Sequence, residues 1–157
     1  EYDIVGPWYK CNMTDIIAVI GLVQMKRYPS MLQRRNEIIE QYDAALSKEG
    51  IEVLNHYDND HRSSGHLYIT RIPNISLEQR QAIIEQMAEC GIATNVHYKP
   101  LPMMTAYKNL GFDIANFPNA YARFANEITL PLHTKLTSEE IEYIIDNYIR
   151  ITKQFMQ

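Results

Sequence analysis

The stretch Gly6-Pro-Trp-Tyr-Lys-Cys-Asn-Met-Thr-Asp-Ile16 runs directly into the apolar segment Ile16-Ile-Ala-Val-Ile-Gly-Leu-Val23, and this junction decides how the chain begins to fold. Thr14, followed by an aspartate, is a good N-cap, so a helix is expected to start here. Lys10 and Asn12 lie beside this helix start, where backbone N–H groups point outward and suit an anion such as a phosphate. A plain helix entry with aromatic packing is the alternative interpretation.

The residues after this junction keep helical spacing of apolar side chains to about residue 48. Pro29 interrupts the pattern because proline removes a backbone donor and clashes with the preceding turn. Residues 14–48 therefore predict either two helices or one long kinked helix, and Gly50 is a plausible terminator just beyond it.

The remainder of the chain alternates short strands with helices. Strands are expected at 66–72, 92–98 and 128–132, and helices at 76–90, 104–110, 119–126 and from 137 onward. Two capping boxes, Ser76 with Gln79 and Thr137 with Glu140, mark helix starts. The pattern predicts an α/β fold, a two-layer small domain with a small sheet preceded by the long helix. We expect three parts: a loop at 1–13, the helix or helix pair at 14–48, and the small domain at 49–157.

The composition excludes several classes of function. The chain has 157 residues, 46% of them hydrophobic, and a formal net charge of −4 without a basic block, so no nucleic-acid partner is expected. No apolar run approaches the length of a membrane span. Cys11 and Cys90 lie outside any CxxC spacing, which favours free thiols in a reducing compartment. The first residues lack the features of a signal peptide, so a cytoplasmic location is expected.

Two segments are candidates for binding sites. His97-Tyr98-Lys99-Pro100 follows an expected strand, and its side chains can donate hydrogen bonds to phosphate or sugar oxygens. A partly buried histidine at a strand edge explains the same pattern. The acidic loop Asp58-Asn-Asp60 departs from the calcium-loop spacing, so a solvated loop is expected there and no metal site. The sequence lacks GxSxG, P-loop and GxGxxG motifs, and it shows no complete catalytic constellation.

Several segments, in order along the chain, resemble one family. Residues 6–22 are similar to the G-Y-(N/K)-Y-(R/N)-M-(T/S)-(D/E)-I-x-A-A-I-G-L segment of the DegT/DnrJ/EryC1/StrS family, the pyridoxal-phosphate-dependent sugar aminotransferases of fold type I. Residues 91–100 resemble the family's G-I-x-(T/S)-x-V-H-Y-x-P. Further similar segments lie at 34–43, 117–120, 130–132 and 136–141.

The resemblance implies that this chain corresponds to the C-terminal part of such an enzyme. The family's N-terminal cofactor-binding domain, which carries the Schiff-base lysine, has no counterpart here, so no catalytic residue is assigned and the chain alone is expected to be inactive. The family works as homodimers, and the loop matching residues 9–13 reaches the cofactor phosphate of the neighbouring subunit. By position, Lys10 and Asn12 would bind the cofactor. Tyr9, His97 and Tyr98 would bind substrate.

The implied reaction uses pyridoxal 5′-phosphate to move an amino group from an amino acid, with glutamate expected, to a nucleotide-linked keto-sugar for polysaccharide biosynthesis. Trp8 and Cys11 depart from the commonest family pattern in the cofactor-facing loop. Two alternatives stay open: a pyridoxal- or pyridoxamine-phosphate sugar dehydratase of the same family, and a non-catalytic binding or dimerisation module.

Overall fold

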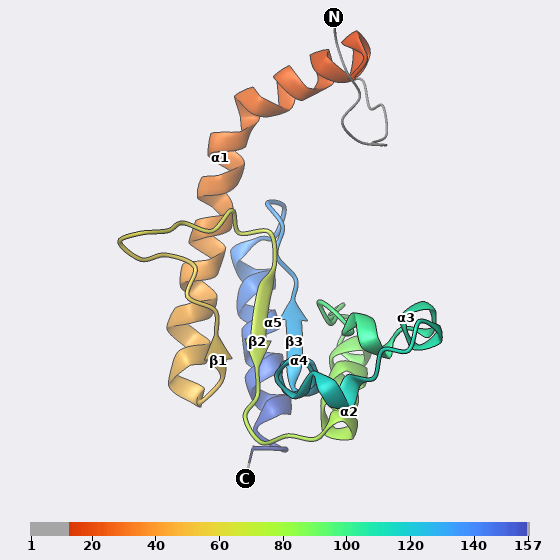
Figure 1. The fold of residues 1–157 in the computed structure, drawn as a ribbon. Coiled ribbons are helices and arrows are strands. Elements are labelled where there is room, and N and C mark those ends of the chain that lie inside the picture. The colour runs from red at the N-terminus through yellow and green to blue at the C-terminus, as the bar shows by residue number, and fades with distance from the viewer. Residues whose placement is uncertain (1–12, 157) are drawn as a thin grey trace, which may run out of the picture.

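A computed structural model describes residues 13–156, and Figure 1 shows them as a long helix that projects from a small α/β domain. The expected α/β class, the small sheet and the long preceding helix are confirmed. The loop expected at residues 1–13 lies almost entirely outside the described residues. The division of the chain into three parts stays a prediction.

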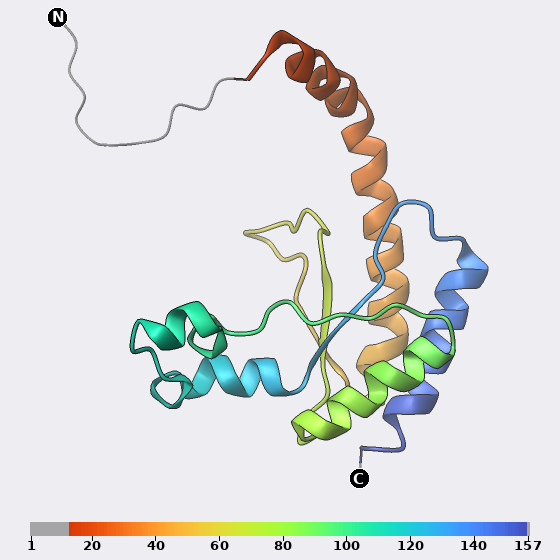
Figure 2. The same cartoon turned by 90° about the vertical axis from the view of Figure 1, so that its right-hand side faces the viewer.

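The long helix α1 is one continuous element, Asp15–Leu46, with Pro29 inside it. Its N-cap is Thr14, whose hydroxyl accepts a hydrogen bond from the Ile17 N–H at 3.4 Å. The helix bends along its length in Figures 1 and 2, as expected for a helix that contains an internal proline. A short 3₁₀ turn at Ser47–Glu49 follows, and Gly50 ends the unit with a φ of +75°, a conformation that glycine adopts without strain.

The two halves of α1 have different surroundings. In the second half, four apolar side chains are fully buried: Ile38, Ile39, Tyr42 and Leu46. In the first half, large apolar side chains are exposed among the described residues: Ile16, Ile17, Val19, Ile20, Leu22, Val23 and Met25. Only the second half of α1 therefore belongs to the domain's core.

The sheet has three strands among the described residues, β1 (Glu52–Val53), β2 (Tyr68–Arg71) and β3 (Glu127–Leu130), in the order β1-β2-β3 with antiparallel neighbours. The register pairs Arg71 with Glu52 on one side and with Glu127 on the other. Strand β1 was not predicted, and β2 and β3 are close to the expected positions.

Four further helices complete the domain: α2 (Leu77–Glu89), α3 (Thr105–Asn109), α4 (Pro118–Ala125) and α5 (Ser138–Thr152), with 3₁₀ turns at Leu101–Met103 and Ile114–Asn116. Both predicted capping boxes are confirmed, because the side chains and backbone N–H groups bond reciprocally at the starts of α2 and α5. Local sequence signals therefore placed these helix starts correctly.

The two faces of the sheet have different partners. Tyr68 and Thr70 in β2 are buried against the helices, where the Tyr42 and Tyr68 rings lie 4.7 Å apart and Thr70 bonds the Tyr148 hydroxyl of α5. Alternate residues of a strand point to opposite faces. Arg71 and Glu127 therefore lie on the other face, and Figure 2 shows α1 and α5 on one side of the strands with α3 and α4 on the other.

The strand expected at residues 92–98 was wrong. This segment makes one isolated bridge to β3, in which Asn95 and Thr129 exchange two backbone hydrogen bonds of 3.1 and 2.8 Å. The next two backbone donors bond side chains instead: Val96 N–H donates to the Asn95 side chain at 2.8 Å, and His97 N–H donates to the Glu127 carboxylate. Side-chain acceptors that compete for backbone donors end the ladder after one pair.

Candidate functional site

The predicted site residues divide into two groups. Tyr9, Lys10 and Asn12 lie outside the described residues, so their roles stay predictions. His97 and Tyr98 are described, and both line a cavity of about 300 Å³, here called the His97 cavity. Its lining residues come from β2, β3, α4 and the segments near them: Leu54, Ile69, Arg71, His97, Tyr98, Pro100, Ala120, Arg123, Phe124 and Glu127.

The His97 cavity lies on the sheet face that α1 and α5 do not cover. Ile69 and Arg71 reach it from β2, and Glu127 reaches it from β3, because the register places these residues on the same face. Helix α4 adds Arg123. The antiparallel pairing of two short strands therefore gathers charged residues that are far apart in the sequence.

Two arginines line the cavity together with the carboxylate of Glu127. The Arg71 guanidinium is held by Glu52 Oε2 at 2.9 Å and by Asn126 Oδ1 at 3.1 Å, so its orientation is set by the protein. Arg123 is exposed at the edge of the cavity. Guanidinium groups bind phosphate and carboxylate through paired donors, so these side chains suit an anionic ligand.

A buried hydrogen-bond chain supports His97. Its backbone N–H donates to both carboxylate oxygens of Glu127, at 3.0 and 3.2 Å, and its imidazole Nδ1 lies 2.9 Å from Thr129 Oγ1. The Thr129 hydroxyl in turn donates to Glu127 Oε1 at 2.8 Å. Glu127 is 5% exposed and Thr129 is 4% exposed, so water has little access to these hydrogen bonds. His97 is thus fixed both at its backbone and at its ring.

Tyr98 has a different environment from its neighbour. Its side chain is 69% exposed, and its ring meets the His97 ring edge-on with centroids 4.7 Å apart. The peptide bond between the two residues is cis. An exposed aromatic ring beside a fixed imidazole is suited to contact a ring-shaped ligand such as a sugar or a base.

Arg80 of α2 supports the site from beneath α4. It is buried, donates a hydrogen bond to the Phe124 carbonyl, and lies 4.5 Å from the centre of the Phe124 ring. Burial lowers the pKa of the Arg80 guanidinium, and the negative charge of Glu127 partly opposes that effect. Arg80 therefore joins α2 to the end of α4, just before β3 begins.

Sequence reasoning missed Arg71, Arg123, Glu127 and Thr129. Three of them lie in strands, and only the register of β2 against β3 shows that Arg71 and Glu127 face each other. The sequence of β3, Glu-Ile-Thr-Leu, alternates polar and apolar residues, and this local signal puts Glu127 and Thr129 on one face of the sheet. All four residues of β3 are buried, so the alternation alone does not show that the polar face lines a cavity.

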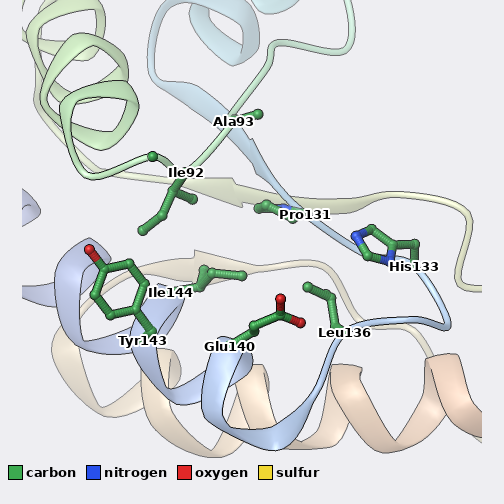
Figure 3. Close-up of a pocket in the computed structure, with 9 residues that line it drawn as sticks. Ile92, Ala93, Pro131, His133, Leu136, Glu140, Tyr143 and Ile144 are labelled. Atoms are coloured by element: carbon green, nitrogen blue, oxygen red, sulfur yellow. The ribbon is translucent and has the colours of Figure 1, made fainter.

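A second cavity, of about 530 Å³, lies beyond the other end of β3 and is shown in Figure 3. Its lining is Gly91, Ile92, Ala93, Pro131, His133, Leu136, Glu140, Tyr143 and Ile144. Glu140 accepts the Thr137 N–H in the capping box, and the Tyr143 hydroxyl donates to the Cys90 carbonyl. Glu140 and Tyr143 thus serve local structure and His133 is the remaining ionisable side chain of this lining, whereas the smaller His97 cavity gathers His97, Arg71, Arg123 and Glu127 and is the better candidate for ligand chemistry.

Two further properties concern residues 13–156 only. Within that range, His, Cys, Asp and Glu side chains form no group of three or more that is arranged to bind a metal ion. None of the helices in the same range combines the length and apolar character needed to cross a membrane.

The chain is similar to several known proteins. It is 30% identical over 155 residues to the spore coat polysaccharide biosynthesis protein SpsC of Bacillus subtilis, covering 97% of this chain and 40% of that protein. A solved structure of the putative sugar aminotransferase Spr1654 from Streptococcus pneumoniae, in its PLP form, matches with 57% identity and a TM-score of 0.91. That match covers 100% of this chain and 40% of the other.

A more distant structure agrees with these. Helicobacter pylori PseC, an aminotransferase of pseudoaminic acid biosynthesis, matches with 27% identity and a TM-score of 0.82, over 99% of this chain and 43% of that one. The chain thus spans about 40% of the length of the relatives it matches. Residues 2–148 match the model of one family. The chain therefore belongs to the DegT/DnrJ/EryC1/StrS aminotransferase family.

Proposed function

We propose that this chain is the C-terminal part of a pyridoxal-phosphate-dependent enzyme that transfers an amino group from an amino acid, with glutamate as the donor, to a nucleotide-linked keto-sugar. The observation that carries the proposal is the 57% identity over the whole chain to the putative sugar aminotransferase Spr1654, whose structure was solved in its PLP form. The His97 cavity, with its two arginines and fixed imidazole, supports it with chemistry suited to a sugar phosphate.

The cofactor and the substrate would use different residues of this chain. Lys10 and Asn12 would hold the cofactor phosphate, and they lie outside the described residues. The polar residues of the His97 cavity suit the substrate: Arg71 and Arg123 suit the phosphates of the nucleotide, and His97 suits a sugar hydroxyl. Pyridoxal phosphate, when bound, supplies the electron sink for moving the amino group.

The enzyme would act as a homodimer in the cytoplasm, with this chain contributing to a site that it does not complete alone. The chain by itself is then expected to show no amino transfer, because the family resemblance implies that the Schiff-base lysine lies in an N-terminal domain that this chain does not span. Its own residues bind and orient the sugar, and they leave the covalent chemistry to the cofactor and that lysine.

The test uses the complete gene product. After incubation with ¹⁵N-glutamate and nucleotide-linked keto-sugars, mass spectrometry should find the label in an amino sugar. Arg123→Ala should raise KM for the nucleotide sugar about tenfold or more, as expected for a lost charge-assisted contact, without changing the retained cofactor. Lys10→Ala should lower cofactor retention.

Lys48→Ala is the matched control, because it removes an exposed cation outside the His97 cavity. Label that stays in glutamate would contradict the proposed transfer. A product that loses a hydroxyl without gaining nitrogen would identify a dehydratase instead. Equal KM values for Arg123→Ala and Lys48→Ala would remove the cavity from the substrate site.

A further inference from the structure

The Thr129 hydroxyl has a single proton, and it is donated to Glu127. Thr129 Oγ1 donates to Glu127 Oε1 at 2.8 Å, and an ionised carboxylate can only accept. The same carboxylate also receives the backbone N–H of His97. With two donors pointing at it and the guanidinium charge of Arg80 nearby, the Glu127 side chain is set up as an acceptor.

The hydrogen bond between Thr129 and the His97 imidazole can then run in one direction only. Oγ1 and Nδ1 of His97 are 2.9 Å apart, so a proton must lie between them, and Thr129 has none left to give. The proton therefore belongs to Nδ1, which donates to Oγ1. A neutral imidazole carries a proton on one nitrogen only, so Nε2 of His97 bears a lone pair.

The opposite tautomer is disfavoured by burial. It would place the lone pairs of Nδ1 and Oγ1 against each other, or it would turn the hydroxyl away from Glu127. Glu127 and Thr129 are 5% and 4% exposed, so water is not at hand to satisfy the acceptor that would be left over. An unpaired buried polar group costs about 1–3 kcal/mol, which is enough to select one tautomer.

Nε2 is the free end of this arrangement. His97 lines the cavity, and no hydrogen bond joins its Nε2 to another residue within 13–156. We propose that Glu127 and Thr129 are positioning residues that fix neutral His97 with its proton on Nδ1, so that Nε2 accepts a hydrogen bond from a hydroxyl of the bound ligand. That the ligand is a sugar rests on the proposed function, whereas the tautomer does not.

This assignment gives the cavity a rule for selecting ligands. A ligand that presents a hydroxyl to Nε2 gains a hydrogen bond, and one that presents an acceptor at the same place is repelled. Replacing that hydroxyl by hydrogen or by an O-methyl group should weaken binding about tenfold, the usual loss for one hydrogen bond.

The tautomer can be measured directly on the chain without cofactor or substrate. Long-range ¹H–¹⁵N correlation spectra of chain labelled with ¹⁵N-histidine, recorded at the alkaline end of the titration, distinguish a protonated Nδ1 from a protonated Nε2. The His97 signals are identified by their loss in His97→Gln. The expected result is the Nδ1–H pattern, the reverse of the preference of a free histidine side chain.

Three variants separate positioning from general stability. Thr129→Val keeps the shape but removes the hydroxyl and should return His97 to the Nε2–H form, while Thr129→Ser should keep the Nδ1–H form. Glu127→Gln can donate its amide hydrogen to Oγ1, which frees the Thr129 proton for Nδ1 and should also favour Nε2–H.

Each result either supports or overturns the proposed tautomer of His97. A wild-type spectrum with the Nε2–H pattern overturns the proposal even if every variant fails to fold. A Thr129→Val spectrum with an unchanged Nδ1–H pattern shows that the hydroxyl does not set the tautomer. Because no amino transfer is measured, a negative assay for the proposed function leaves this result standing, and the reverse also holds.

Discussion

At the scale of single residues, the domain depends on a few buried polar side chains whose partners are backbone groups. Arg80 illustrates this, because its guanidinium donates to the Phe124 carbonyl and stacks on the Phe124 ring. Thr70 similarly donates to the Ile128 carbonyl. The Arg80 contact fixes where α4 ends, beside the His97 cavity, and the Thr70 contact fixes how β3 lies against β2.

Replacing Arg80 should therefore weaken the fold. Arg80→Met keeps an apolar stem of similar length but leaves the Phe124 carbonyl without its donor, so the free energy of unfolding should fall by about 1–3 kcal/mol. Urea denaturation measures the change. Gln81→Met, at an exposed position of the same helix, is the control and should change the free energy by less than about 0.5 kcal/mol. Equal effects would show that Arg80 has no special structural role.

The buried His56 side chain is expected to make the free energy of unfolding depend on pH. It is 4% exposed and stacks on Tyr68, with ring centroids 5.6 Å apart. Burial lowers its pKa, and the charge of Asp43 opposes this in part. Since the folded pKa lies below the unfolded value of about 6.5, protonation favours the unfolded chain. The stabilisation is present above that pH and should decrease as the pH falls below it.

Thermal or urea unfolding between pH 7.5 and 5.5 tests this. His56→Phe should lose stability less steeply on acidification than the wild type. His61 acts in the opposite direction, because its hydrogen bonds to the Asn55 carbonyl and the Asp58 carboxylate raise its pKa. His61→Gln should therefore steepen the loss on acidification. Parallel profiles for all three proteins would contradict the assignment.

The sequence identified His97 and Tyr98 by their residue types and by the family resemblance, but not the residues that orient them. Glu127 and Thr129 act on His97 only because Asn95 pairs with Thr129. A shift of one residue in that pairing would turn the side chains of the 92–98 segment, including His97, to the other face of the sheet. This pairing joins residues far apart in the sequence, and local sequence patterns do not reveal it. The roles of Glu127 and Thr129 were therefore not predicted.

At the scale of elements, helix starts follow local rules and strand edges do not. The capping boxes of α2 and α5 involve residues only three apart, so they could be read directly from the sequence. The segment 92–98 has strand-forming residues, yet its ladder stops where the Asn95 and Glu127 side chains take the backbone donors. That competition depends on a residue 30 positions away from His97.

The two N-cap threonines should contribute unequally to stability. Thr137→Ala should lower the free energy of unfolding by about 1 kcal/mol, because α5 is packed in the core and cannot fray without exposing it. Thr14→Ala removes the same kind of cap from the exposed end of α1, so global stability should barely change. Denaturation measures the first effect, and amide hydrogen exchange in the first turns of α1 measures the second. A larger global loss from Thr14→Ala would show that this end is packed in solution.

At the scale of the whole molecule, the chain combines a packed domain with an apolar helical arm. The arm is the first half of α1, where Ile16 and Ile20 are 76% and 57% exposed. A helix that is apolar on all sides is normally buried by a partner. The fold class could be predicted from the sequence because element order decides it, whereas the exposure of this arm needed the structure.

We expect the isolated chain to associate through this arm. Sedimentation velocity should show a concentration-dependent rise in mass, and the double variant Ile16→Glu, Ile20→Glu should reduce it. The control Gln81→Glu, Ala88→Glu adds the same charge at exposed positions of α2. A purely monomeric wild type, or equal suppression by the control, would contradict a role for the arm.

The extended segment 92–98 has a consequence for anyone who modifies this domain. Ile92 and Ala93 line the larger cavity, His97 and Tyr98 line the smaller one, and the Asn95 pair fixes the backbone between them. At about 3.3 Å per residue, the four residue steps from Ala93 to His97 span at most about 13 Å of chain between the two linings. A bulkier side chain at Ile92, which is 5% exposed, would press on the same backbone that sets the position of the imidazole. We therefore expect a substitution in the lining of one cavity to alter the position of residues that line the other, so the two cavities should be engineered together.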